Sequence, residues 1–521
     1  MVLTEILARN ARVYGDRTAL IEREPVGKTR REITWDQFYR QSNTFSNALR
    51  NMGVEKGDRV VHLMMNCLEW LPVYFGILRA GAVAVPLNFR FEAPAISRCT
   101  NLCEAGIIVF GEEFTERITQ VKTELDKSVS KYIYAGSFEK CPDFAVTLNE
   151  TMQVQDSAEP DVEVKPWDGA GIYFTSGTTG EPKGVYLLHR QLEFACYVEN
   201  RHHNQVHSDN FLCIPPLYHT GAKMHWFGNF IVGARSVILK GVSPQAILEA
   251  VSEEKVTIVW LLVPWAHDIL VALENGELCL EDYTLEQWRL MHIGAQPVPP
   301  SLIEKWQKVF PDQDYDTNYG LTEATGPGCV HLGLENMHKV GAIGRAGFDW
   351  ECRVVDDYGN NLAPGVPGEL LVKGPGVMEC YHRNPDATGS VLRDGWLHTG
   401  DIVKMDQDGF LWLIDRKKDV IITGGENIFP VEIESYLMRH TDILDAAVIG
   451  LPDRRLGEIV AAVISLKPGR SMTESEITAF CAEMPRYKRP RKIFFDSVPR
   501  NPTGKIEKPS LRKKYADAAG G

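Results

Sequence analysis

A loop rich in glycine and hydroxyl residues is the part of this sequence best suited to chemistry. The stretch TSGTTGEPKG lies between two apolar runs, GIYF and VYLL. Glycines let the backbone approach a ligand and turn successive amides toward an anion, while Ser and Thr hydroxyls add hydrogen-bond donors. With the positive charge of the lysine, this composition predicts a polyphosphate site. The candidate residues are Thr175, Ser176, Gly177, Thr178, Thr179, Gly180 and Lys183.

This loop does not match the Walker A pattern G-x-x-x-x-G-K-[ST]. Counted from Gly177, the second required glycine falls on Pro182, and Gly184 follows the lysine where Ser or Thr is needed. The mismatch disfavours a P-loop NTPase. A flexible surface linker is the plain alternative, and the apolar runs on both sides disfavour it.

Four later stretches also combine residue types that could do chemistry. The first joins an aromatic ring to a hydroxyl and a carboxylate, and the second is a glycine turn that ends in an acid. The third joins a basic run to paired glycines, and the fourth is a turn with a single lysine. Taken singly, each has a plain reading, because a Thr-Glu pair often begins a helix and a Gly-Lys turn is usually solvated. The stretches are YGLTE (Tyr319–Glu323), GWLHTGD (Gly395–Asp401), DRKKDVIITGGENI (Asp415–Ile428) and NPTGKI (Asn501–Ile506).

Length, composition and charge indicate what kind of protein carries these residues. A chain of 521 residues, 44% hydrophobic and 24% charged, predicts a globular protein of at least two domains. The net charge of −13 argues against a nucleic-acid binder. Neither a signal peptide nor a membrane-spanning stretch is apparent, and the eleven cysteines lack CxxC pairs. These features predict a cytoplasmic protein with reduced thiols.

Hydrophobic patterns predict alternating helices and strands in the first part of the chain. ITWDQFYRQSNTFSNALRNMG predicts an amphipathic helix ending at Gly53, and DRVVHLMM predicts a buried strand. Similar alternation recurs at RSVILKG and SPQAILEAVSEEKVTIVWLLV. It indicates parallel sheets covered by helices. Between about 340 and 415, turns such as DDYGN, APGVPG and DQDGF predict a small β-rich subdomain.

The end of the chain predicts a separate small domain. Pro430 opens one helix, and Thr473 with Glu476 forms a capping box at another. Lys and Arg outnumber Asp and Glu from Arg416 onward, so this piece could close over a phosphate-rich ligand, although a basic solvated surface explains the charge equally well. The expected fold is mixed α/β: a large N-terminal domain of βα-layered subdomains with a β-rich subdomain, 1–415, and a small mobile α+β domain, 416–521.

Together, in this order and spacing, the five stretches resemble the adenylate-forming superfamily of acyl-CoA synthetases, peptide-synthetase adenylation domains and beetle luciferases. The resemblance covers essentially the whole chain. It implies that a carboxylic acid and ATP form an acyl-adenylate and pyrophosphate, after which coenzyme A takes the acyl group and AMP leaves. ATP, Mg²⁺ and coenzyme A are the implied cofactor and co-substrates.

The resemblance also implies roles for single residues in the nucleotide site. The loop would hold the β- and γ-phosphates, and Thr322 the α-phosphate. Glu323 would bind Mg²⁺, a hard cation that prefers oxygen ligands. The catalytic set would be Lys505, Thr322 and Glu323. The remaining nucleotide contacts would come from Tyr319 at the adenine, Asp401 at the ribose, and Arg416 at ribose or phosphate. Gly320 would also contact the nucleotide.

The second half-reaction would use the same cleft after a domain rotation. Lys418 is the implied hinge, and its rotation would remove Lys505 from the reaction centre. Gly424, Gly425 and Glu426 would then reach the coenzyme A arm.

The acid pocket is expected in three stretches. By resemblance His219 is the pocket gate; a core histidine bound to a backbone carbonyl is the alternative. Trp226 and Trp265 would shorten the pocket and favour ring-containing or short- to medium-chain acids. No Asp lies where an amino-acid ammonium would need one, and Lys223 is expected to point to solvent rather than to bind a second carboxylate. The remaining wall residues are Gly294, Ala295 and Gln296.

Several functions remain to be separated. A stand-alone acyl-CoA synthetase acting on a small carboxylic acid is the simplest reading, because no carrier-protein domain fits in the chain. The alternatives are an acyl-AMP ligase that loads a carrier protein, and a non-catalytic binding protein on the same fold. The latter would require loss of the loop, Glu323 or Lys505, and all three are present. A homodimer is left open.

Overall fold

The computed structural model describes residues 1–516 except 126, 154–155, 177–181, 295–297, 327 and 501–505, and Ser176 by its backbone alone. Contacts divide the chain into two compact units: Met1–Glu351 with Lys373–Leu397, and Cys352–Val372 with His398–Gly521. This grouping differs from a division after Asp415, because the strands before that residue join the C-terminal residues. The boundary at 415 concerns which segment moves, and it stays a prediction.

The first unit contains a seven-stranded sheet in the order β14-β13-β12-β10-β11-β1-β2. Its neighbours pair in parallel, except for the antiparallel edge pair of β1 and β2. Parallel strands place their carboxyl ends at one edge, which is where open α/β sheets bind ligands. The strands are β14 (Asp314–Asp316), β13 (Leu290–Gly294), β12 (Ile258–Leu262), β10 (Asn210–Cys213), β11 (Arg235–Leu239), β1 (Thr18–Glu24) and β2 (Thr29–Thr34).

A second sheet of this unit has eight strands in the order β20-β9-β8-β4-β3-β5-β6-β7. Pairing is parallel from β8 to β7, whereas β8, β9 and β20 pair antiparallel. The glycine-rich stretch therefore begins on β8 and ends on β9, two paired antiparallel strands. The strands are β20 (Cys380–Tyr381), β9 (Pro182–Leu188), β8 (Gly169–Ser176), β4 (Val83–Pro86), β3 (Arg59–Leu63), β5 (Ile107–Gly111), β6 (Lys131–Ala135) and β7 (Val146–Thr147).

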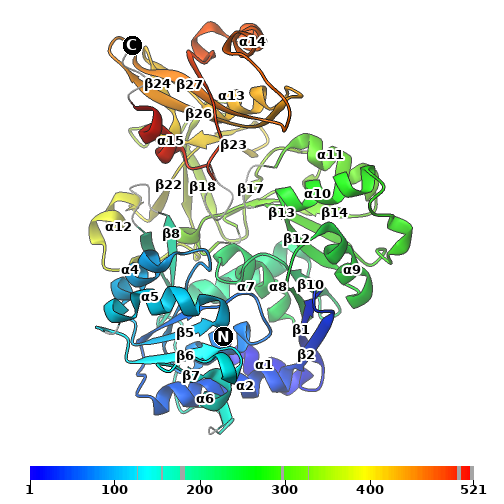
Figure 1. The fold of residues 1–521 in the computed structure, drawn as a ribbon, viewed down its shortest axis with the longest axis vertical. Coiled ribbons are helices and arrows are strands. Elements are labelled where there is room, and N and C mark those ends of the chain that lie inside the picture. The colour runs from blue at the N-terminus through cyan, green and yellow to red at the C-terminus, as the bar shows by residue number, and fades with distance from the viewer. Residues whose placement is uncertain are drawn as a thin grey trace. The chain divides into compact units, whose positions relative to one another are not determined.

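Helices cover both sheets, and several begin at local capping signals. At the start of α2 the Thr34 hydroxyl accepts from the Gln37 amide at 3.2 Å. Ser243 caps α9, whose first residue is Pro244. Figure 1 shows α9, α10 and α11 beside β12 and β13. The helices are α1 (Leu3–Tyr14), α2 (Trp35–Asn51), α3 (Trp70–Arg79), α4 (Ala93–Cys103), α5 (Thr115–Leu125), α6 (Leu148–Gln153), α7 (His189–His203), α8 (Thr220–Ile231), α9 (Pro244–Glu254), α10 (Val263–Glu274), α11 (Pro300–Val309) and α12 (Pro385–Val391).

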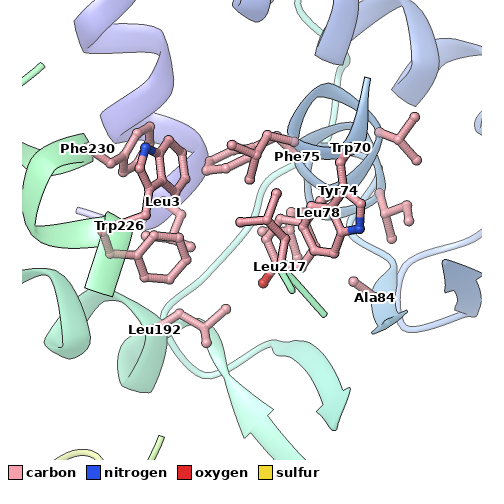
Figure 2. Close-up of a cluster of buried hydrophobic side chains, with 14 of the residues drawn as sticks. Leu3, Trp70, Tyr74, Phe75, Leu78, Ala84, Leu192, Leu217, Trp226 and Phe230 are labelled. Carbon is pink, nitrogen blue, oxygen red and sulfur yellow. The ribbon is translucent and has the colours of Figure 1, made fainter. Parts of the chain in front are cut away.

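The largest hydrophobic core of this unit lies between α1, α2, α3 and α8. Figure 2 shows Leu3, Phe75, Trp226 and Phe230 packed together in it. A three-stranded antiparallel sheet follows the seven-stranded one along the chain. It consists of β15 (Asn318–Tyr319), β16 (Val330–His331) and β17 (Arg345–Ala346). The short strand β21 (Leu392–Arg393) follows α12 and pairs with β22.

The second unit contains two small sheets. The first contains β18 (Glu351–Val355), β19 (Gly368–Lys373), β22 (Trp396–Met405) and β23 (Leu411–Arg416), as predicted for the β-rich region. The second has β24 (Ile421–Thr423), β25 (Glu426–Ile428), β26 (Ile443–Asp453), β27 (Gly457–Leu466) and β28 (Lys492–Phe495). Its helices are α13 (Pro430–Leu437), α14 (Glu474–Phe480) and α15 (Lys508–Tyr515).

The structure confirms the mixed α/β fold and the local helix signals in this second unit. Pro430 opens α13, and Thr473 with Glu476 forms the predicted capping box of α14. All eleven cysteines are free thiols. Within the described residues, no helix combines the length and the apolar character needed to cross a membrane.

Candidate active site

The sequence-predicted residues of the first unit gather beyond the carboxyl ends of four neighbouring strands. His219 follows β10, Trp265 follows β12, Gly294 ends β13, and Tyr319 follows β14. These stretches are far apart in the chain, and the strand order β14-β13-β12-β10 makes each the neighbour of the next. Tertiary structure therefore builds one candidate site from segments that the sequence shows only separately. Ala295 and Gln296 lie outside the described residues.

The phosphate-loop candidates belong to the hairpin of β8 and β9. Thr175 pairs directly with Lys183 across the two strands. Four further candidates lie outside the described residues, as does the Ser176 side chain: Gly177, Thr178, Thr179 and Gly180. The Lys183 ammonium lies 4.9 Å from the centre of the Tyr381 ring. The structure thus fixes the base of the loop next to a residue that sequence reasoning did not single out.

Tyr381 connects this loop to the YGLTE stretch. Its hydroxyl donates to Glu323 Oε1 at 2.7 Å, and the Met378 amide donates to the Glu323 carbonyl at 2.8 Å. Burial raises the pKa of Tyr381, and the negative charge of Glu323 raises it further, so the phenol stays protonated and donates. Thr322 and Glu323 begin a short 3₁₀ turn and are both half-buried. No local pattern marked Tyr381, because its partner lies 58 residues away.

The second unit brings another predicted pair together. Asp401 on β22 is directly opposite Arg416 on β23, and Arg416 Nε lies 3.8 Å from Asp401 Oδ1. Gly424 and Gly425 form the exposed turn between β24 and β25, with φ of +58° and +87°. Such backbone angles favour glycine, and the exposed Glu426 follows directly. Lys505 lies outside the described residues.

Comparison with known proteins decides the family. The AMP-binding enzyme model matches residues 7–382, and the model of the AMP-binding enzyme C-terminal domain matches residues 432–505. The chain belongs to the AMP-binding enzyme family. It is an AMP-forming acid–CoA ligase of the acyl-CoA synthetase branch, which uses ATP, Mg²⁺ and coenzyme A.

Relatives of this AMP-binding enzyme match it over nearly its full length. It is 31% identical to the long-chain-fatty-acid–CoA ligase FadD13 of Mycobacterium tuberculosis, covering 93% of each chain. It is 32% identical to a feruloyl-CoA synthase of Amycolatopsis, covering 93% of this chain and 94% of the relative. The crystal structure of the anthranilate CoA ligase AuaEII with anthranoyl-AMP aligns with a TM-score of 0.88 at 27% identity, covering 100% of this chain and 98% of that one.

Two expectations about the acid pocket of this AMP-binding enzyme are wrong. Trp226 is fully buried in the hydrophobic core, where its ring packs against Phe230 and its Nε1 donates to the Ser236 hydroxyl at 2.8 Å (Figure 2). It is therefore a core residue and not a pocket wall. Lys223 does not point to solvent: it is fully buried, and its ammonium donates to the Tyr173 hydroxyl at 2.7 Å.

The buried lysine is enclosed by aromatic rings. Lys223 Nζ lies 4.3 Å from the ring centres of Tyr74 and Tyr173, and the two phenol oxygens are 2.8 Å apart. Burial lowers the pKa of Lys223 well below its usual value. Since its contacts are with core tyrosines, we do not retain it as a ligand for a second carboxylate.

His219 occupies the first position before α8. It is half-buried, and its Nδ1 accepts from the Gly221 amide at 3.1 Å, so it caps the helix. This position disfavours a core histidine, and the gate remains a prediction. Trp265 is half-buried at the start of α10.

Sequence reasoning missed a buried cluster of charged and polar residues behind the strand ends. His203 donates to Asp316 at 2.8 Å and its other nitrogen lies 3.1 Å from Glu199, with all three side chains buried. Burial alone would lower the pKa of His203, but the charges of Glu199 and Asp316 raise it to about 10, so the ring is a cation at neutral pH. The i,i+4 spacing of Glu199 and His203 on α7 is the one signal that could have suggested the pair.

The cluster continues as a chain of histidines toward α8. His292 Nδ1 lies 2.9 Å from His203 Nε2, and His292 Nε2 lies 3.0 Å from His225 Nε2. His203, His292 and Asp316 bring ligand atoms within 4.8 Å of one another, a spacing that a metal ion could bridge. Their hydrogen bonds to each other account for this spacing without an ion, so we assign the cluster a structural role.

Proposed function

We propose that this enzyme activates a ring-bearing or short- to medium-chain carboxylic acid and transfers it to coenzyme A. A carboxylate oxygen attacks the α-phosphorus of ATP, and pyrophosphate leaves. The thiol of coenzyme A then attacks the acyl carbon, and AMP leaves with the electron pair of the broken bond. The observation that carries the proposal concerns one edge of the seven-stranded sheet. His219 follows β10, Gly294 ends β13, and the stretch with Thr322 follows β14.

The proposed nucleotide contacts follow the family resemblance, residue by residue. The loop from Thr175 to Lys183 holds the β- and γ-phosphates, and Thr322 hydrogen-bonds the α-phosphate. Tyr319 stacks on the adenine, and Gly320 also contacts the nucleotide. Asp401 accepts hydrogen bonds from both ribose hydroxyls, and Arg416 contacts ribose or phosphate. The observed pairing of Asp401 with Arg416 supports this assignment, because it places a carboxylate and a cation opposite each other on paired strands.

Glu323 fits the role of Mg²⁺ ligand. Its carboxylate is half-buried, one oxygen is fixed by Tyr381, and the other has no hydrogen-bond partner among the described residues. When bound, Mg²⁺ neutralises part of the phosphate charge. Tyr381 is then a positioning residue, since it acts through the carboxylate that it holds.

Tyr381→Phe should weaken the use of Mg-ATP by about 10-fold in kcat/KM, because the lost hydrogen bond is to a charged group. Phenylalanine keeps the ring beside Lys183 and removes the hydroxyl alone. The measurement is acid-dependent pyrophosphate release across a Mg²⁺ titration, in which excess Mg²⁺ should restore part of the rate. Tyr358→Phe, at an exposed site, is the matched control. An unaltered Mg²⁺ dependence in Tyr381→Phe would contradict the positioning role.

The thioester-forming half would use the C-terminal residues. Lys505 contacts the α-phosphate only during adenylation, and Lys418 is the proposed hinge. Gly424, Gly425 and Glu426 then approach coenzyme A; the positive φ of both glycines supports a close backbone approach. Because the acyl-adenylate is already a reactive donor, positioning of a partly ionised thiol suffices.

The acid class rests on the pocket residues and on the relatives. His219, Trp265 and Gly294, with Ala295 and Gln296, form the proposed wall, and the half-buried Trp265 limits its length. By their names the feruloyl-CoA synthase and the anthranilate ligase act on ring-containing acids, which supports such an acid here. FadD13 acts by name on long-chain fatty acids, so palmitate is the competitor to test.

An acid panel tests the proposal. Mg-ATP, coenzyme A and a ring-containing or C4 to C10 acid should yield AMP, pyrophosphate and a thioester, and these acids should exceed palmitate in kcat/KM, because a pocket of a few hundred Å³ encloses about this size. Parallel assays without coenzyme A separate adenylation from transfer. Stoichiometric ADP and orthophosphate would contradict the reaction, and a maximum at palmitate would contradict the acid class.

We further propose that the enzyme works in the cytoplasm, which the eleven free thiols support. Light scattering of the purified chain tests the homodimer that the resemblance left open.

A further inference from the structure

The indole N–H of Trp260 is a buried donor with no partner among the described residues. Trp260 lies on β12 with 3% of its surface exposed, and its Nε1 makes no hydrogen bond. An indole nitrogen is a donor only, and an unmade buried hydrogen bond costs about 1–3 kcal/mol. The indoles of Trp35, Trp70 and Trp350 also lack hydrogen-bond partners in the described part of the chain, so the surroundings of Trp260 must decide whether its N–H has a ligand.

Those surroundings are polar and include a glycine at the carboxyl end of the next strand. A Cβ on Gly294 would have only two described side-chain atoms within 4 Å: Trp260 Nε1 at 3.7 Å and Asn318 Oδ1 at 3.8 Å. No other atom of the described residues is near the side-chain position of Gly294, which a donor and an acceptor face. In contrast, the glycines beside Trp350 already have carbon atoms of its ring within 2.6 Å of their Cβ positions.

The indole is held in one orientation by its other neighbours. The His225 ring stacks on it, with ring centroids 4.4 Å apart and an angle of 12° between the planes. A Cβ on Gly221 would approach the far edge of the indole to 3.1 Å, so glycine is needed there. The N–H edge consequently stays directed toward Gly294.

Asn318 is oriented by the same histidine. Its Nδ2 donates to His225 Nε2 at 3.1 Å, and burial lowers the pKa of His225, so this ring is neutral and can accept. With its nitrogen fixed, the amide presents Oδ1 to the side of Gly294. An amide oxygen accepts two hydrogen bonds.

We propose that Trp260 Nε1 and Asn318 Oδ1 bind a hydroxyl group on the acyl part of the substrate, beside Gly294. This assignment rests on the proposed function, in which the residues at these strand ends hold the acid. A hydroxyl accepts from the indole N–H, which thereby gains a partner, and donates to the amide oxygen, which can accept two hydrogen bonds. The substrate class is thus a hydroxylated carboxylic acid, with the hydroxyl on a ring or chain away from the carboxylate.

Pairs of acids that differ by one oxygen test this assignment. The probes are cyclohexanecarboxylate with its 3- and 4-hydroxy and 4-oxo derivatives, and 3-phenylpropionate with its 4-hydroxy derivative. Sites built to hydrogen-bond a substrate hydroxyl discriminate strongly against analogues without it. At least one hydroxylated acid should exceed its parent by about 10-fold or more in kcat/KM. The oxo acid, which only accepts, should fall between the two.

Trp260→Phe should reduce this preference to about unity, because the ring remains and the N–H is lost. Trp226→Phe is the matched control, since that buried indole donates to Ser236 and should leave the preference intact. Gly294→Ala provides a second variant: its methyl fits at ordinary contact distance and occupies the proposed hydroxyl position, so it should lower the rate with the hydroxylated acid more than with the parent.

The outcomes distinguish a failure of the Trp260 assignment from a failure of the proposed function. Thioester formation with no preference for any hydroxylated acid overturns the Trp260 assignment and leaves the proposed function standing. A preference that survives both Trp260→Phe and Gly294→Ala also overturns the assignment. Absence of AMP and pyrophosphate with every acid overturns the proposed function and the assignment together.

Discussion

Lys505→Ala should lower adenylation by roughly 10²- to 10³-fold, the usual effect of removing one preorganised charge from a transition state. The attacking carboxylate and the α-phosphate are both negative, so the loss of a cation there raises the barrier of the first half-reaction. Thioester formation from supplied acyl-AMP and coenzyme A should persist, because Lys505 is proposed to have left the site by then.

Acid-dependent ATP–pyrophosphate exchange measures the first half-reaction, and thioester formation from acyl-AMP measures the second. Lys513→Ala is the matched control: it removes an exposed lysine of the same basic segment. Lys505 itself lies outside the described residues, between Arg500 and Ile506, which form an antiparallel bridge. Equal damage to both half-reactions would show that the lysine supports the fold of this segment rather than one chemical step.

Lys418→Pro should leave pyrophosphate exchange intact and reduce thioester formation from acyl-AMP by about 100-fold or more. Proline fixes φ near −65° and removes an amide donor, so a pivot at this position loses one of its two orientations. The expectation follows the family resemblance, in which the adenylating orientation is the one retained.

The structure gives this position the surroundings of a short linker. Lys417 and Lys418 are exposed, whereas Asp415 and Asp419 on either side are buried. Asp415 accepts from the Val431 amide at 2.9 Å, and Asp419 pairs with Arg512 at 3.0 Å. Both partners, Val431 and Arg512, lie on the C-terminal side of Lys418, so a rotation at Lys418 must break the hydrogen bond of Asp415 and can keep the ion pair of Asp419.

Lys418→Ala is the control for the charge, since it removes the ammonium and leaves φ free. Both half-reactions should be measured on one folded sample together with its Tm. If Lys418 is simply a solvated lysine in a structural turn, proline should lower the Tm and reduce both activities in parallel. That parallel loss would end the hinge proposal.

The sequence determined the features that depend on neighbouring residues. The capping box of Thr473 and Glu476, the proline that opens α13 and the alternation of helices with strands are all local, and the structure confirms them. The order of the five glycine- and charge-bearing stretches identified the family without a structure, because each stretch carries its own chemistry. The positive φ of Gly424 and Gly425 likewise follows from residue type at a tight turn.

Tertiary structure decided which side chains meet and which are buried. Helix α8 is buried on every side from Thr220 to Phe230, so no polar face in its sequence could show where Lys223 and Trp226 point. The pairs Tyr381–Glu323 and Lys223–Tyr173 join residues 58 and 50 positions apart. Such contacts depend on strand order and on the packing of whole elements, which set the environment of a side chain more strongly than its nearest neighbours in the chain do.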